Sequence, residues 1–409
     1  MAGCRFCGTA LRHTFVDLGM SPLCESFLAP EQLNQMEPFY PLHAKVCAHC
    51  FLVQVEEYVR PERIFSEYAY FSSYSDAWLQ HARSYTDMIA SRLDLSADSH
   101  VIELGSNDGY LLQFFVGKGI PVLGIEPAAN VAAAAEARGV RSLTTLFGLE
   151  TAGQLAASGE QADLVIGNNV LAQVPDLNGF VAGIARVMKP HGVATLEFPH
   201  LLRLMRENQF DTIYHEHFSY FSFLTVSQIF AAHGLTLFDV EELWTHGGSL
   251  RIYARHAADE TRPIGPRVAA LLERERAAGL DAIEHYSLFT QQVEETKRKL
   301  LAFLIRAKSE GKTVAGYGAP GKGNTLLNYC GIRTDFLDYT VDRNPYKHGK
   351  FLPGTHIPIF HPERIKETRP DYLLILPWNL KHEIMNQMGE IRAWGGRFVV
   401  PIPTLEVCA

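Results

Sequence analysis

The chain has 409 residues, of which 47% are hydrophobic and 20% charged, a balance typical of folded globular proteins rather than disordered ones. This length exceeds what one hydrophobic core usually supports, which predicts two or three domains. A formal net charge of −8 argues against nonspecific binding of nucleic acid, which needs a basic face. A local basic pocket for a phosphorylated small molecule is still compatible with that charge.

The N-terminal residues, Met-Ala-Gly-Cys-Arg-Phe-Cys, lack the apolar segment of a secretion signal, and the chain has no run of about 18 apolar residues that would span a membrane. We therefore expect a cytoplasmic protein that does not cross a membrane. Disulfides are rare in that reducing compartment, so paired cysteines indicate a metal site.

Two cysteine pairs of equal spacing, Cys4-x-x-Cys7 and Cys47-x-x-Cys50, can turn four thiolates toward one tetrahedral zinc ion. A closed shell of four soft ligands leaves no position for water, so such a site is structural. The alternatives are chance pairing, a redox-active Cys-x-x-Cys, or a nearby histidine in place of one cysteine. We expect residues 1–75 to form a small, loop-rich zinc-binding domain.

An aromatic and hydroxyl-rich segment, Glu67-Tyr-Ala-Tyr-Phe-Ser-Ser-Tyr-Ser-Asp76, precedes a predicted helix over residues 78–93. Its rings suit either packing between domains or the wall of a ligand pocket. We expect three of them, Tyr70, Phe71 and Tyr74, to contact the substrate.

The next part alternates apolar strands with helices, the pattern of a parallel sheet covered on both faces. The predicted strands are residues 99–105, 120–126, 162–168 and 192–198, and an alanine-rich helix is predicted over residues 128–138. The sequence therefore predicts an α/β fold with a doubly wound sheet.

A glycine-containing turn, Gly105-Ser-Asn-Asp-Gly109, follows the first of these strands, and an acid, Glu126, ends the second. Glycines let a ligand approach the backbone, and the acid can accept hydrogen bonds from both hydroxyls of a ribose. The pattern Glu-x-Gly-x-x-x-Gly resembles motif I of class I methyltransferases, which implies S-adenosylmethionine as the cofactor. By this resemblance the cofactor is bound by Glu103, Gly105, Ser106, Asn107, Gly109, Glu126 and Asn168.

A polar cluster, Tyr214-His-Glu-His217, follows the last predicted strand. One interpretation is acid–base catalysis, in which a histidine titrates near neutral pH and a carboxylate or phenol orients it. A metal site is a second interpretation, although His-x-Glu-x-His without a distant third ligand matches known zinc sites poorly. A polar loop with buried, hydrogen-bonded histidines is the third.

Residues 263–310 are predicted to be helical and to connect to a last unit that opens with Gly316-Tyr-Gly-Ala-Pro-Gly-Lys-Gly-Asn324. This loop fits Gly-x-Gly-x-x-Gly with an acid, Asp342, farther along, which is the dinucleotide-binding pattern. It also nearly fits a P-loop, but Gly323 stands where a magnesium-binding hydroxyl is required. A sugar nucleotide, NAD(P), or no ligand at all are the open interpretations of this unit.

Taken together, these motifs resemble those of the sugar C-methyltransferases that act on nucleotide-linked 4-keto-6-deoxyhexoses. The resemblance covers nearly the whole chain, including both cysteine pairs, Asp17-Leu-Gly-Met-Ser-Pro-Leu and the Tyr70 segment. It implies methylation at C3 next to the ketone, through an enolate. By resemblance, His217 is the general base, Tyr214 and Glu216 position it or polarise the ketone, and Asn169 lies near the reacting groups.

The resemblance also implies that the C-terminal Rossmann-like unit holds the sugar nucleotide. The residues expected to contribute are Tyr317, Gly318, Lys322, Gly323 and Asn324. Gln173 stands where relatives are expected to have a histidine, which favours His217 acting alone.

We expect a methyltransferase domain over residues 76–262, followed over 263–409 by a helical bridge and the Rossmann-like domain. An NAD(P)-dependent oxidoreductase of a sugar nucleotide and a noncatalytic nucleotide-binding module are the alternative functions.

Overall fold

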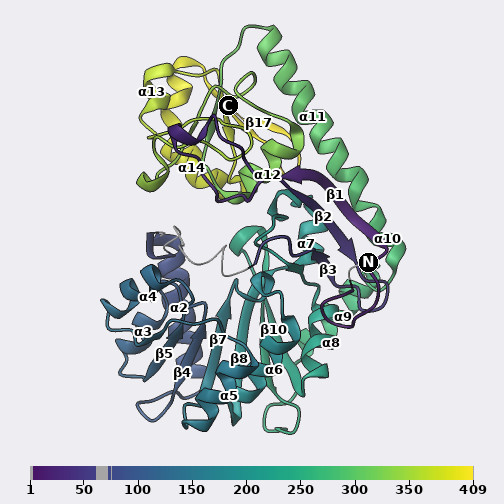
Figure 1. Ribbon diagram of the computed structural model, residues 1–409, viewed down its shortest axis with the longest axis vertical. Coiled ribbons are helices and arrows are strands. Elements are labelled where there is room, and N and C mark those ends of the chain that lie inside the picture. Colours follow the sequence, from purple (N-terminus) through teal and green to yellow (C-terminus); the bar gives the residue numbers. More distant parts are fainter. Residues whose placement is uncertain (1–2, 61–71, 75, 409) are drawn as a thin grey trace.

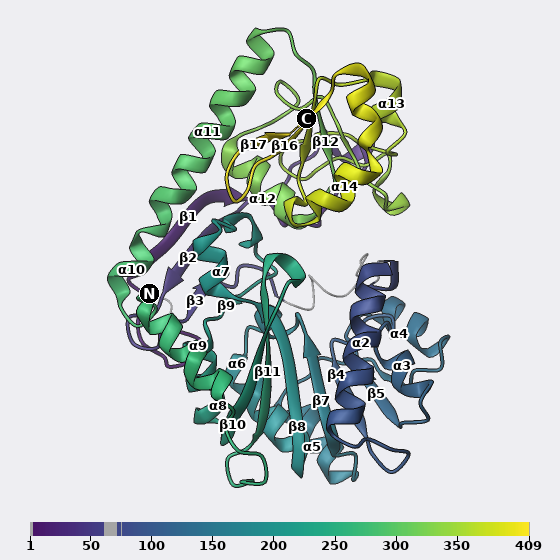
Figure 2. The same cartoon turned by 180° about the vertical axis from the view of Figure 1, so that it is seen from behind.

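The computed structural model describes residues 3–60, 72–74 and 76–408, in which three β-sheets form (Figure 1). A seven-stranded sheet builds the lower lobe of Figure 1, and a six-stranded sheet builds the upper lobe. Seen from behind in Figure 2, the long helix α11 (Phe289–Ser309) runs along one side of the molecule toward the upper lobe. No helix within the described ranges has the length and apolar character that a membrane crossing requires.

The lower lobe contains the predicted doubly wound sheet. Its strands are β4 (Val101–Leu104), β5 (Val122–Ile125), β6 (Ser142–Leu143), β7 (Ala162–Asn168), β8 (Met188–Pro199), β10 (Leu235–Leu243) and β11 (Ser249–His256). They lie in the order β10-β11-β8-β7-β4-β5-β6, parallel from β8 to β6, with β10 and β11 antiparallel. The strand order reverses beside β4, and ligands bind at such a switch point in open α/β sheets. The sequence analysis did not predict the antiparallel pair.

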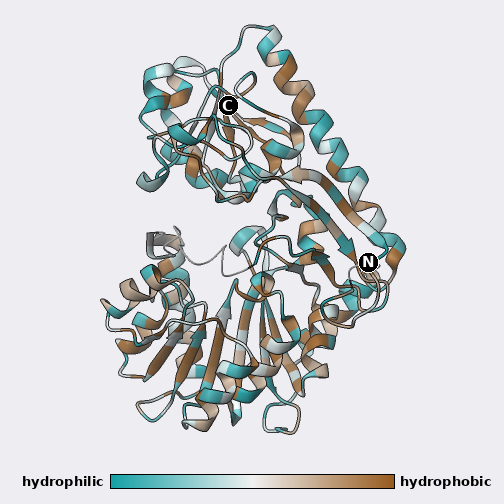
Figure 3. Cartoon of the chain, viewed as in Figure 1, coloured by the Kyte–Doolittle hydropathy of each residue, from teal (hydrophilic) through white to brown (hydrophobic). Residues whose placement is uncertain are grey.

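Helices pack on both faces of this sheet. They are α2 (Asp76–Arg92), α3 (Leu112–Val116), α4 (Ala129–Glu136), α5 (Leu149–Ala157), α6 (Leu177–Val187) and α8 (Phe223–Ala232). The short helix α7 (Leu201–Arg206), which follows β8, packs instead with the N-terminal sheet. In β4, Ile102 and Leu104 pack with α5 and α6, whereas Val101 packs with α2 and α3. A central strand buried on both faces is mostly apolar, and Figure 3 shows that hydrophobic residues predominate in the central strands of this sheet.

The upper lobe contains the sheet β14-β13-β12-β15-β16-β17, parallel except for β17. Its strands are β12 (Val314–Tyr317), β13 (Thr340–Val341), β14 (Ile359–Phe360), β15 (Tyr372–Ile375), β16 (Arg397–Val400) and β17 (Glu406–Cys408). Its helices are α12 (Gly321–Cys330), α13 (Arg364–Thr368) and α14 (Lys381–Gln387). The predicted helical connection consists of α9 (Pro266–Ala277), α10 (Ile283–Ser287) and α11.

The N-terminal segment contains a small sheet that the sequence analysis did not predict. Strands β1 (His13–Ser21), β2 (Tyr40–Val46) and β3 (Val53–Val55) form an antiparallel sheet, which β9 (Ser219–Tyr220) extends. In β2, Leu42, Ala44 and Val46 are buried while their neighbours are partly exposed. This period of two is the signal of a half-buried strand, and it is visible in the sequence.

The N-terminal segment packs against the upper lobe and against α11. Phe15 of β1 stacks on Phe289 of α11 with a ring-centroid distance of 4.6 Å. Beyond β1, Leu28 and Phe351 exchange backbone hydrogen bonds of 3.0 and 2.9 Å. The core of the upper lobe is therefore continuous with residues from the start of the chain.

Candidate active site

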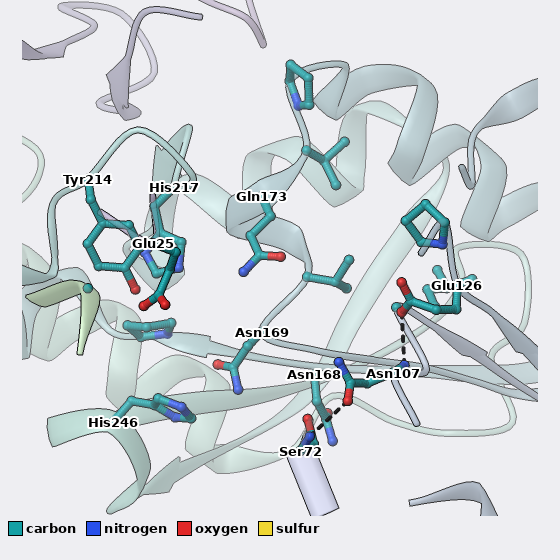
Figure 4. A pocket seen from close by; sticks show the side chains of 18 of the residues that line it. Glu25, Ser72, Asn107, Glu126, Asn168, Asn169, Gln173, Tyr214, His217 and His246 are labelled. Atoms are coloured by element: carbon teal, nitrogen blue, oxygen red, sulfur yellow. Dashed lines mark hydrogen bonds between the residues drawn. The ribbon is translucent and has the colours of Figure 1, made fainter. Parts of the chain in front are cut away.

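A cavity of about 780 Å³ lies where the carboxyl ends of the lower sheet face the upper lobe. Residues from the N-terminal segment, the lower lobe and the upper lobe all line it, and Figure 4 shows part of its wall. A cavity of this size is within the usual range for small-molecule sites.

The turn after β4 forms one end of the cavity. Gly105 and Asn107 both line it with positive φ angles, of 66° and 49°, and Gly105 has no Cβ to crowd a ligand. Glu126 at the end of β5 accepts hydrogen bonds from the backbone N–H groups of Asn107 (3.0 Å) and Ala128 (2.9 Å). These two bonds fix the carboxyl at the cavity wall and leave it acceptor capacity for the hydroxyls of a ribose.

Three of the predicted cofactor residues do not line the cavity. Glu103 and Ser106 are completely buried, and burial raises the pKa of the Glu103 carboxyl well above its usual value. A Cβ on Gly109 would lie 3.2 Å from the Cβ of Ala135, so this glycine permits close packing with α4. These residues support the turn, whereas Gly105, Asn107 and Glu126 face the ligand space.

Asn168 and Asn169, at the end of β7, present amides to the same cavity. Asn169 has a positive φ of 56°, and its N–H donates to the carbonyl of Glu197 at 2.7 Å. Both polar side-chain atoms of Asn168 and the Oδ1 of Asn169 are buried without a hydrogen-bond partner among the described residues. Buried polar atoms normally have partners, so these amides fit a polar ligand such as the predicted cofactor.

His217 and Tyr214 lie together on another side of the cavity, with ring centroids 4.2 Å apart. Burial lowers the pKa of His217 to about 3, although a hydrogen bond to the backbone of Thr212 opposes this shift. The imidazole is therefore neutral at physiological pH. With one ring nitrogen bonded to a carbonyl, the other can present its lone pair to a substrate.

Glu216 points elsewhere. Its Oε2 accepts the Sγ–H of Cys24 at 3.2 Å, and burial raises the pKa of this carboxyl to about 7. Gln173 does line the cavity, so the amide that replaces the expected histidine lies within the site itself.

The upper lobe contributes the start of α12. Lys322 lines the cavity, and its Nζ donates to Asn379 Oδ1 at 2.9 Å and lies 4.7 Å from the centre of the Trp378 ring. Backbone amides at a helix N-terminus and an ammonium group together favour an anion such as a phosphate. The Nζ of Lys347, also at the cavity, lies 3.6 Å from Glu25 Oε2.

The other residues predicted for substrate binding in this unit do not line the cavity. The Tyr317 hydroxyl donates to Gln387 at 3.0 Å, and the side-chain amide of Asn324 donates to the carbonyl of Cys24. Gly318 and Gly323 lie under Pro377 and Leu376, where a Cβ would be too close.

Two of the aromatic residues predicted to contact the substrate, Tyr70 and Phe71, lie outside the described residues, as does the side chain of Tyr74. The neighbouring Ser72 lines the cavity, and its N–H donates to Asn107 Oδ1 at 2.9 Å.

Sequence analysis missed Glu25 and His246, which line the cavity together with Lys347 from distant parts of the chain. Glu25 and Lys347 have no local motif, and only the contact between the N-terminal segment and the upper lobe brings them together. For His246, the signal was the neighbouring glycine pair Gly247-Gly248, which marks a tight turn before a strand.

The four cysteines of the two pairs meet at the edge of the N-terminal sheet. Their Sγ atoms all lie within 4.8 Å of one another, with 3.5 Å between Cys4 and Cys50 and 3.5 Å between Cys7 and Cys47. A tetrahedron with Zn–S bonds of about 2.3 Å requires Sγ–Sγ separations of roughly 3.8 Å. The cluster therefore fits a zinc ion.

Comparison with known proteins agrees with this geometry. The chain is 37% identical to C-methyltransferase NovU of Streptomyces niveus over 404 residues, which cover 99% of this chain and 96% of that protein. The chain belongs to the C-methyltransferase family. Family models for a zinc-binding domain, a methyltransferase domain and a C-methyltransferase C-terminal domain match residues 4–65, 77–240 and 244–403.

Two further matches cover less than half of this chain. A ubiquinone biosynthesis O-methyltransferase of Rhodopseudomonas palustris is 32% identical over 107 residues, or 25% of this chain and 42% of that protein. A solved S-adenosylmethionine-dependent methyltransferase of Clostridium acetobutylicum has a TM-score of 0.35 and 9% identity, over 44% of this chain and 92% of that one.

The methyltransferase model and the strand order confirm the predicted class I methyltransferase fold, and with it S-adenosylmethionine as cofactor. The zinc-binding model and the cysteine cluster confirm the predicted zinc site.

Proposed function

We propose that this C-methyltransferase adds a methyl group to C3 of a nucleotide-linked 4-keto-6-deoxysugar, through an enolate and with His217 as general base. The observation that carries the proposal is the single cavity that joins three elements. These are the nucleoside-binding turn at Glu126, the neutral imidazole of His217 and the phosphate-binding start of α12 at Lys322.

The domain assignment follows from this arrangement. We assign zinc binding to residues 1–75, cofactor binding to 76–262, and the nucleotide part of the acceptor to the unit within 263–409. A sugar that extends from Lys322 and Lys347 toward Asn169 would place its ring between the two lobes.

The chemistry begins with proton abstraction next to the ketone. A ring nitrogen of His217 takes the C3 proton, the C–H electron pair forms the new C=C bond, and the carbonyl π pair moves onto the C4 oxygen. Tyr214, in contact with the His217 ring, restricts the plane of the imidazole. The raised pKa of Glu216 and its bond to Cys24 support a role in holding this loop rather than in touching the acceptor.

When bound, S-adenosylmethionine would supply an electrophilic methyl group, to which the enolate carbon would bond while the S–CH₃ electron pair remained on sulfur. Asn107 and Glu126 orient the cofactor at one end of the cavity, and Asn169 separates that end from His217. Loss of the proton from His217 to solvent then restores the base.

The oxidoreductase alternative has less support. Asp342, the acid of the dinucleotide pattern, accepts the N–H groups of Ala319 (2.7 Å) and Asn344 (2.8 Å) and does not line the cavity among the described residues.

The test is to incubate the zinc-loaded protein with S-adenosylmethionine and a panel of dTDP- and GDP-linked 4-keto-6-deoxysugars in deuterated water, and to follow the products by mass spectrometry and NMR. We expect methyl gain at C3, and C3 deuterium exchange when S-adenosylhomocysteine replaces the methyl donor. His217→Asn should reduce both by about 10²–10⁴-fold. The matched control is His233→Asn, since His233 pairs with Asn178 outside the cavity. The absence of both methyl gain and C3 exchange with every acceptor would refute the proposal.

A further inference from the structure

A second histidine, His246, faces the cavity from the turn between β10 and β11. Its backbone has φ 55° and ψ 21°, and Gly247 and Gly248 follow with φ of 90° and 119°. A left-handed backbone conformation is strained for histidine and persists only where the surroundings enforce it.

Neighbouring residues do enforce this turn. The Gln209 side chain donates to the carbonyl of Gly247 at 2.7 Å, and the N–H of His200 donates to the carbonyl of Gly248 at 3.0 Å. The turn is thus bonded to two elements of the lower lobe, and the His246 ring is held in one place.

The ring environment leaves its polar atoms free for a ligand. Trp78 meets the ring edge-on with centroids 5.2 Å apart, and Trp78 in turn stacks on His81 and Tyr110. The Nδ1 atom of His246 is buried and has no hydrogen-bond partner among the described residues. The Nε2 atom also has no hydrogen-bond partner among these residues.

Burial lowers the pKa of His246 to about 4, and the nearby charge of Lys322 lowers it further, against a smaller raising effect of Glu197. His81 also lowers it, and His246 in turn lowers the pKa of His217. The ring of His246 is therefore a neutral imidazole that carries one N–H. It lies close enough to His217 to affect the pKa of that histidine.

We propose that His246 is a second catalytic residue, whose ring N–H donates a hydrogen bond to the C4 oxygen of the acceptor as that oxygen becomes an enolate. This inference rests on the proposed function and adds the group that stabilises its intermediate. While His217 takes the C3 proton, the charge that develops on oxygen is met by the His246 donor, and no proton is transferred from His246.

A neutral donor suits this step. An imidazolium would transfer its proton and give a neutral enol, whose carbon attacks the methyl group less readily than that of an enolate. A neutral N–H stabilises the charge and keeps the carbon nucleophilic. Such a donor, placed in a water-excluded site before the reaction, typically contributes about 10²–10³-fold to kcat.

The experiment compares His246→Asn and His246→Gln with the wild-type protein. Asparagine tolerates a positive φ, so the Asn variant should fold, and its short amide does not reach the position of Nε2. Glutamine reaches that position with an N–H donor. The matched control is His356→Asn, since His356 also has a positive φ (56°) but pairs with Glu37 away from the cavity.

Three quantities are measured: kcat and KM for methyl transfer, the C3 exchange rate with S-adenosylhomocysteine, and the thermal shift that S-adenosylhomocysteine produces. We expect His246→Asn to lower kcat and exchange together by about 10²–10³-fold, with little change in KM or thermal shift. His246→Gln should recover part of the loss, and His356→Asn should match wild type.

Wild-type exchange rates in His246→Asn, or a raised KM with unchanged kcat, would overturn the inference while leaving the proposed function intact. An inactive wild-type protein would overturn the proposed function, and this inference with it.

Discussion

The lowered pKa of His217 predicts how kcat/KM depends on pH below neutrality. A histidine with the usual pKa of 6.5 is only about 3% neutral at pH 5, so a base of that kind would lose roughly 30-fold in kcat/KM between pH 8 and pH 5. Burial lowers the pKa of His217 to about 3, so nearly all of the base remains available at pH 5. We therefore expect kcat/KM to show no protonation of this histidine near pH 6.5.

The first assay is a pH profile of methyl transfer with an acceptor found to be active. The second is an NMR titration of the His217 ring, whose signal is assigned because it is absent from the spectrum of His217→Asn. Asp211 and Glu216, with pKa values raised to about 7, titrate in the same window, and the NMR signal separates them from the base. An imidazole signal of His217 that titrates near 6.5 in the free protein would refute the reasoning.

The same shift affects stability. A histidine whose folded pKa is depressed contributes stability that is complete above 6.5 and is lost as the pH falls toward the folded value. For His217 the loss between pH 7 and pH 5 is roughly 2 kcal/mol. His217→Asn lacks this loss, so its stability relative to wild type should improve by about that amount at pH 5. Equal differences at both pH values in urea unfolding would contradict it.

Three further substitutions test separate parts of the site. Cys47→Ser should lower the zinc content below one ion per chain, measured by metal analysis, and unchanged stoichiometry would refute the four-cysteine site. Glu126→Ala should weaken S-adenosylhomocysteine binding by about 10–100-fold in calorimetry, whereas Glu160→Ala, which removes ion pairs with Arg141 and His100 away from the cavity, should not. Lys322→Ala should raise KM for the nucleotide-linked acceptor without changing S-adenosylhomocysteine affinity, and the surface control Lys366→Ala should alter neither.

The parallel strands of the seven-stranded sheet were predictable because they are short apolar runs with polar ends. Residues 162–168 were predicted as a strand and form β7 with those bounds, since all but Asp163 and the terminal Asn168 are buried. The antiparallel partners β10 and β11 were missed because their pairing depends on register between segments rather than on local pattern.

One end of the cavity was partly predictable, since Gly105 and Asn107 lie in one recognisable turn after β4 and Glu126 follows the next strand, β5. The motif cannot say which small residue faces a ligand and which permits packing. Gly105 faces the cavity, whereas Gly109 packs against α4, and only the fold separates the two roles.

The glycine-rich loop of the upper lobe also contains glycines that permit packing rather than ligand binding. A Cβ on Gly321 would lie 2.7 Å from the Sγ of Cys24, and Asn324 donates to the Cys24 carbonyl. Cys24 also bonds Glu216, which belongs to the His217 loop. Part of what resembles a dinucleotide pattern is therefore a contact surface for the N-terminal segment. The contact around Cys24 thus joins the start of α12, which carries Lys322, to the loop that carries His217, and both residues line one cavity.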